Sequence, residues 1–213
     1  MKQKLILSSL FVLILFTGFK TLKTGLFENN ADVGNPKIAG SSSYDAQKKE
    51  YTLIGSGYNI WFERDEFQYL FKEIKGDFTI TGDFELVGKG ADPHRKVGWM
   101  VRESLDADAS HLSAVVHGDG LTVLQWRIAK GKTMRDPEDE IFSKEKYIRT
   151  VQIEKKGTLY SMRVASKGQP LQIVGSRTMP NLPEKVMVGM YICSHNPAVK
   201  EEVKVWNVKI IQN

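Results

Sequence analysis

Three basic side chains occupy comparable positions on strand-like segments in the middle of the chain. Arg102, His117 and Arg127 each lie near the end of a short alternating stretch, and Gly and Asp residues separate these stretches. Guanidinium groups bind carboxylate or sulfate in bidentate geometry, so these residues could form a cationic face for acidic or sulfated sugars. The alternative is that neighbouring acids such as Glu103 or Asp119 satisfy them in ion pairs.

The alternation of side chains along these stretches predicts which residues share a face. In 97–104, Arg102 points to the same side as Gly98 and Met100. If the three stretches are neighbouring strands, one polar patch should contain Arg102, His117, Gln125 and Arg127.

Aromatic residues near turns could add sugar contacts, because the apolar face of a pyranose packs on a ring. Tyr58 and Trp61 follow a glycine-rich approach, and we expect both to be exposed ligand-binding residues. Tyr69 and Trp99 fit a core position better.

The chain shows no complete catalytic or metal-binding motif. A sandwich glycosidase needs paired carboxylates on one strand face, and Glu63 with Asp65 lacks the third carboxylate of such a site. A lyase of the alginate type would need a tyrosine base that we cannot identify. Asp106 and Asp108, with Asp119 and others more scattered, could supply oxygen ligands to Ca²⁺, although polar loops explain them more simply. We therefore expect no catalytic residues, no metal ligands and no cofactor, with Ca²⁺ as the one alternative.

The segments that carry these residues are predicted to be β-strands. Apolar and alternating runs recur at intervals typical of an all-β domain, with Gly, Asn, Asp or Pro between them, and 136–146 reads as a loop or one helical turn. Glycine-containing turns at 118–120 and 156–157 suit hairpins. The predicted strands are 51–54, 67–74, 78–87, 97–104, 112–117, 121–128, 148–155, 159–165, 171–176, 186–193 and 203–211.

The first 23 residues read as a signal peptide or an uncleaved N-terminal anchor, since two lysines precede an apolar run at 5–19. We expect residues 24–43 to be a linker and lead-in, and 44–213 to form one domain. The chain has 30 basic and 25 acidic residues, but four lysines lie in the leader, so the remainder carries 26 against 25. Charge therefore gives no argument for nucleic acid. The single cysteine, Cys193, reads as a buried thiol in a strand.

A set of glycine, acidic and aromatic positions resembles the concanavalin A-like and laminin G-like jelly rolls of bacterial secreted proteins. The matching residues are Gly76, Asp77, Phe78, Gly98, Met100, Arg102, Arg127, Ile153, Lys155, Lys156, Gly157, Val188, Gly189, Trp206, Asn207, Val208 and Ile210. The resemblance implies an all-β fold, a two-sheet antiparallel jelly-roll β-sandwich. Because this fold carries lectins, adhesion modules, glycosidases and lyases alike, it implies no single activity.

These observations together predict an exported carbohydrate-binding module, periplasmic, secreted or anchored by its leader, whose ligand is an acidic or sulfated polysaccharide or oligosaccharide. One alternative is a polysaccharide-cleaving enzyme, either a glycoside hydrolase or a lyase. A second is an envelope module that binds a protein partner. We expect no nucleic-acid partner and no membrane contact beyond the leader.

Overall fold

The computed structural model describes residues 24–212, so the expected leader lies outside the described residues. These residues form strands and loops, and no helix among them could cross a membrane. The strands are β1 (Asn29–Val33), β2 (Ser41–Asp45), β3 (Glu50–Gly55), β4 (Ile60–Trp61), β5 (Arg64–Asp65), β6 (Phe67–Lys75), β7 (Phe78–Leu86), β8 (Lys96–Arg102), β9 (His111–His117), β10 (Thr122–Arg127), β11 (Glu140–Phe142), β12 (Thr150–Lys156), β13 (Leu159–Ala165), β14 (Gln172–Thr178), β15 (Lys185–Cys193) and β16 (Glu201–Gln212).

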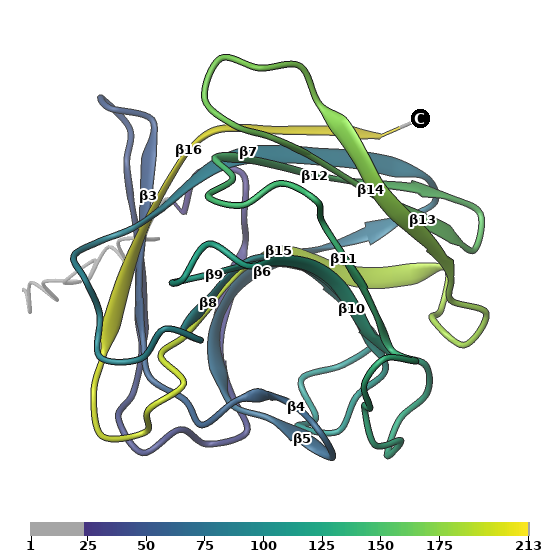
Figure 1. Cartoon of the computed structure of the whole chain (residues 1–213), viewed down its shortest axis with the longest axis horizontal. Helices are drawn as coiled ribbons and strands as arrows, with labels where there is room; N and C mark the ends of the chain where they lie inside the picture. The colour runs from purple at the N-terminus through teal and green to yellow at the C-terminus, as the bar shows by residue number, and fades with distance from the viewer. Residues whose placement is uncertain (1–23, 213) are drawn as a thin grey trace, which may run out of the picture.

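Two seven-stranded antiparallel sheets pack face to face. Sheet A has the order β1-β6-β15-β8-β9-β10-β11, and sheet B has the order β14-β13-β12-β7-β16-β3-β2. Sheet A is strongly curved, and the short β4–β5 hairpin lies opposite its concave side (Figure 1). The predicted all-β jelly-roll sandwich is confirmed.

The main core lies between the two sheets. Strands of sheet B such as β3 and β12 alternate buried and less buried residues, as expected when one face meets the core and the other meets solvent. Trp99 of β8 lies fully buried in this core, and its indole Nε1 donates a 2.8 Å hydrogen bond to the Val151 carbonyl of β12. This bond joins the two sheets at the centre of the sandwich.

The central strands of sheet A are buried on both faces. Every residue of β8, β9 and β10 is buried. The second, smaller apolar cluster lies on the concave side, where Met100, Val115, Val123 and Tyr191 pack with Ile60 of the hairpin. The β4–β5 hairpin therefore covers a face that an antiparallel sheet often leaves in solvent.

All eleven predicted strands are present, with ends that differ by a few residues. The predicted linker at 24–43 is different: β1 lies within it and pairs with β6, and β2 begins in it and pairs with β3. The 136–146 stretch, expected to be a loop or one helical turn, contains β11, which pairs with β10. These three strands, β1, β2 and β11, are short and lie at sheet edges, and such short runs give little periodic signal.

Gly98 of β8 holds a position that no other residue fits. Its φ is 150°, and a Cβ there would lie 1.9 Å from the Ala114 carbonyl oxygen on β9. In the register of these two strands, Arg102 lies directly opposite His111.

Candidate functional site

The polar residues of the concave face hold the β4–β5 hairpin from one end. Arg102 of β8 and Arg127 of β10 flank His111 of β9 across the sheet, since both are paired with His111 in register. All three side chains face Asp65, which the hairpin carries on β5. Arg127 makes a bidentate pair, with 2.8 Å from Nη1 to Oδ2 and 2.8 Å from Nη2 to Oδ1.

The remaining contacts complete the cluster. Arg102 Nη1 lies 3.4 Å from Asp65 Oδ2, and its other nitrogens donate to the Ser104 and Asp106 carbonyls. Arg127 also donates to the carbonyls of Ala109, Phe62 and Lys132. The guanidinium groups thus fasten the loops beside the hairpin as well as Asp65.

Burial and neighbouring charges shift the pKa values of Asp65 and His111 in this cluster. Burial by itself would raise the pKa of Asp65, but the attraction of the neighbouring cationic groups outweighs it and the pKa is lowered. Burial lowers the pKa of His111 to about 3, so its imidazole is neutral at pH 7. Two guanidinium groups thus face one carboxylate, and their joint attraction favours the ionised form of Asp65.

A second set of contacts holds the other end of the hairpin. Lys96 Nζ donates to Asn59 Oδ1 at 2.7 Å, and Gln125 Nε2 donates to the Ile60 carbonyl at 3.1 Å. Burial lowers the pKa of Lys96 to about 8. His117 lies opposite Lys96 in register, with its Nδ1 3.1 Å from the Leu121 carbonyl oxygen, and burial lowers its pKa to about 3.

The predicted polar patch is therefore partly assembled and is not open. Arg102, Gln125 and Arg127 share the concave face as expected, whereas His117 lies at the opposite end of β9 from the arginines. The expected accessibility was wrong: relative exposure is 0% for Arg102, 1% for Gln125, 1% for Arg127 and 6% for His117. The hairpin contacts Arg102, Gln125 and Arg127 directly, and Asp65 takes the place that a ligand's carboxylate would need.

Two residues of the cluster were missed or misread from the sequence. His111 has the same parity as His117, so the alternation of β9 could have placed it on the concave face, but the predicted strand began one residue too late. The sequence presents Asp65 only as a candidate catalytic carboxylate beside Glu63. The acidic partners expected for the basic residues are Glu103 and Asp119. Instead, Glu103 accepts from the Ser110 backbone, and Asp119 accepts from the Leu121 backbone.

The outer side of the hairpin forms an open hollow of about 280 Å³, here called the hairpin hollow. Tyr58 is 46% exposed and Phe62 is 52% exposed, while Trp61 is only 9% exposed. Tyr58 thus agrees with the expected exposure and Trp61 does not, although both border the hollow. The lining residues are Tyr58, Trp61, Phe62, Glu63, Arg64 and Thr133.

The other residues considered for chemistry have ordinary partners. Asp106 Oδ2 accepts from Lys130 Nζ at 2.6 Å, and no group of three His, Cys, Asp or Glu side chains within 24–212 is arranged to hold a metal ion. Burial raises the pKa of Glu140 to about 7, with a further contribution from Asp136. Cys193 is a buried free thiol, as predicted, and burial raises its pKa to about 12.

No model of a known protein family matches the sequence, and no curated protein matches it. Solved structures do match. A functionally unknown protein from Saccharomyces cerevisiae is 17% identical with a TM-score of 0.64, covering 86% of this chain and 96% of that one. Lectin I-B4 from Griffonia simplicifolia is 10% identical with a TM-score of 0.52, covering 93% and 96%. Alginate lyase A1-II′ is 8% identical with a TM-score of 0.52, covering 83% and 85%. At these identities the likeness establishes the fold: a lectin-like jelly-roll sandwich.

Proposed function

We propose that this protein is a carbohydrate-binding module that holds its sugar in the hairpin hollow. One observation carries the proposal. Phe62, in the turn of the hairpin, and Tyr58, just before it, present two rings that are about half exposed, and buried polar contacts fix the hairpin in place. Exposed rings on a rigid support offer a platform for the apolar face of a pyranose at little cost in conformational entropy.

The lining of the hairpin hollow supplies both kinds of contact that a sugar uses. Arg64, Glu63 and Thr133 offer donors and acceptors to hydroxyl groups beside the rings. The Arg64 guanidinium lies 5.8 Å from the centre of the Tyr58 ring and 2.7 Å from a Glu66 carboxylate oxygen, so it is already oriented. Phe62 has a left-handed backbone with φ of 57°, a strained conformation that is found disproportionately at ligand-binding positions.

The comparisons support the class of ligand. Two proteins that share the fold are named as a lectin and as an alginate lyase, and both names refer to proteins whose ligands are saccharides. Binding is favoured over cleavage because Asp65 and His111, which could otherwise exchange a proton, are sealed under the hairpin with both arginines. We also propose that residues 1–23 direct export of the module, where polysaccharides would be accessible to it.

A glycan array followed by affinity electrophoresis tests this function. Wild type should be retained by at least one polysaccharide, and Tyr58→Ala or Phe62→Ala should weaken retention about tenfold, the value of one lost ring contact. Tyr147→Ala is the matched control, because Tyr147 is 75% exposed and has a left-handed backbone like that of Phe62, but does not line the hollow.

Two results would refute the proposal. Equal losses in the Tyr147→Ala and Phe62→Ala proteins would show that the hollow has no special role. Release of reducing ends or unsaturated sugars from the retained polysaccharide would identify an enzyme instead.

A further inference from the structure

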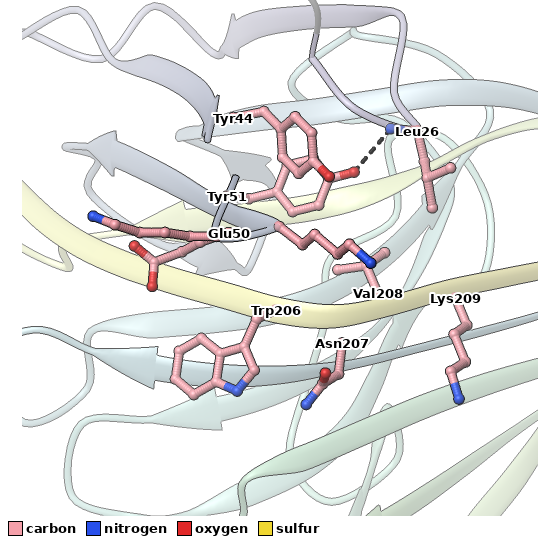
Figure 2. Close-up of a pocket in the computed structure, with 10 residues that line it drawn as sticks. Leu26, Tyr44, Glu50, Tyr51, Trp206, Asn207, Val208 and Lys209 are labelled. Carbon is pink, nitrogen blue, oxygen red and sulfur yellow. Dashed lines mark hydrogen bonds between the residues drawn. The ribbon is translucent and has the colours of Figure 1, made fainter. Parts of the chain in front are cut away.

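A larger hollow of about 640 Å³ lies on the far side of the sandwich, between the β2–β3 hairpin and β16 (Figure 2). It is called the bulge hollow here. The residues used below are Tyr44, Lys49, Trp206, Asn207 and Lys209, all of which line it. None of them belongs to the polar patch or to the hairpin hollow.

A β-bulge in β16 shapes this hollow. The register of β16 against β7 shifts between Trp206 and Lys209, and Asn207 has a left-handed φ of 53°. Asn207 Nδ2 donates to Asp83 Oδ2 at 2.8 Å, which holds the bulge. Figure 2 shows the Trp206, Asn207 and Lys209 side chains leaving the strand on the same side. A regular strand would send Asn207 to the opposite face from Trp206, so the bulge brings an aromatic ring, an amide and a cation together.

The charge of the bulge hollow is positive and incompletely neutralised. Lys48 lies 3.7 Å from Asp45, and Glu50 lies 3.3 Å from Lys204. Within the described residues, Lys49 and Lys209 have no carboxylate within ion-pair distance. Two lysines thus remain available to a ligand.

The aromatic residues that line the hollow lie on both sides of β16 (Figure 2). The Tyr44 and Tyr51 rings pack with centres 4.5 Å apart, and the Arg149 guanidinium lies 4.2 Å from the centre of the Trp206 ring. The Tyr51 hydroxyl accepts a 2.8 Å hydrogen bond from the Leu26 backbone, which fixes that side of the hollow.

The hairpin hollow offers no comparable cationic surplus. Its single basic residue, Arg64, is paired with Glu66, and Glu63 adds a negative charge. Arg102 and Arg127, which suggested an acidic ligand, are buried in ion pairs with Asp65 and are not accessible to a ligand. A negatively charged sugar therefore finds free cations in the bulge hollow and not at the hairpin.

We propose that the bulge hollow is a second saccharide site, selective for sugars that carry a carboxylate or a sulfate ester. Lys49 and Lys209 attract the anionic group, Trp206 contacts the ring, and Asn207 bonds a hydroxyl. The ligand class rests on the proposed carbohydrate-binding function, but the site and its residues are separate from the hairpin hollow.

Affinity electrophoresis in gels containing alginate, dextran sulfate or neutral dextran tests this proposal. Wild type should be retarded by both polyanions, less so as NaCl is added, because salt screens exposed charges. The Lys49→Gln/Lys209→Gln double variant should bind both polyanions about tenfold more weakly, as expected for two exposed ion pairs. The control is Lys144→Gln/Lys146→Gln, which removes the same charge from two exposed lysines elsewhere.

Each result decides the proposal. Equal weakening in the control would show non-specific charge attraction, and unchanged binding in the Lys49→Gln/Lys209→Gln protein, or no retardation of wild type by either polyanion, would likewise overturn the site. A Tyr58→Ala/Phe62→Ala protein separates the two hollows. If it alone loses retention, the proposed function stands and the second site fails. A loss confined to the lysine variant supports the second site, and the hairpin hollow is then judged by the glycan array with the Tyr58→Ala and Phe62→Ala proteins.

Discussion

Arg127 and Asp65 form a bidentate ion pair between β10 and the β4–β5 hairpin, with two contacts of 2.8 Å and both side chains sealed from solvent. The pair joins segments that are 62 residues apart in the chain. It closes the concave face of sheet A and holds the hairpin, and with it Tyr58 and Phe62, in one position. The guanidinium that looked like a ligand contact is therefore a structural anchor for the hairpin hollow.

Replacing Asp65 should destabilise the protein strongly. In Asp65→Asn, two buried guanidinium groups lose their counter-charge, and removal of one partner of such a buried pair costs about 3–5 kcal/mol. Urea unfolding of both proteins measures the change. Asp106→Asn, which breaks an exposed pair with Lys130, should have a much smaller effect because solvent screens that pair. Similar costs for the two variants would contradict the anchoring role.

Gly98 should tolerate no side chain. A Cβ at Gly98 would overlap the Ala114 carbonyl oxygen, so Gly98→Ala should prevent folding or cost several kcal/mol. Gly157→Ala is the control, because Gly157 also has a positive φ, 56°, but has open space around its missing Cβ. It should cost only about 1–2 kcal/mol. Circular dichroism and thermal unfolding compare them, and a mild effect at Gly98 would argue against the close strand approach.

His117 should make stability fall in mild acid. Its folded-state pKa of about 3 lies below its unfolded value of 6.5, so below pH 6.5 the unfolded chain binds the additional proton. This contribution to stability is complete above pH 6.5 and is lost as the pH falls toward 3, at about 1.4 kcal/mol per pH unit. Between pH 7 and pH 5.5, the free energy of unfolding should therefore fall by about 1.4 kcal/mol more in wild type than in His117→Gln.

Three other groups contribute to the pH profile of the wild type. His111 and His195, whose pKa values are lowered by burial, act in the same direction as His117, and Glu140, with its pKa raised to about 7, acts in the opposite direction. These contributions cancel when His117→Gln is compared with wild type. A His117→Gln profile parallel to that of wild type would refute the assignment.

Trp99 should be important to the packing of the two sheets. Trp99→Phe removes the hydrogen bond to Val151 and leaves space beside Phe84, whose ring centre lies 5.0 Å from that of Trp99. We expect a loss of about 2–4 kcal/mol in the free energy of unfolding. The same change at half-buried Trp206 should cost less than about 1 kcal/mol. Chemical denaturation measures both, and equal costs would contradict the central position of Trp99.

The alternation of β8 and β10 was enough to predict that Arg102, Gln125 and Arg127 share one face. It could not show which face, because both sides of these strands are buried and the same parity fits a covered or an open sheet. It also gave no sign that the hairpin β4–β5, whose strands have two residues each, would lie across that face. Local patterns report which residues point together, but they do not report what lies above them.

The sequence alone determined the sandwich, because period-2 alternation and glycine turns are local properties that the chain carries residue by residue. It also pointed to the exposed Tyr58. Tertiary structure decided what the charges do. Asp65 meets Arg127 only when the chain folds back on itself, so the partner of each cation, and hence whether it is free for a ligand, depends on contacts between distant segments. The same is true of the bulge hollow, which Lys49 and Lys209 line together although they are far apart in the chain.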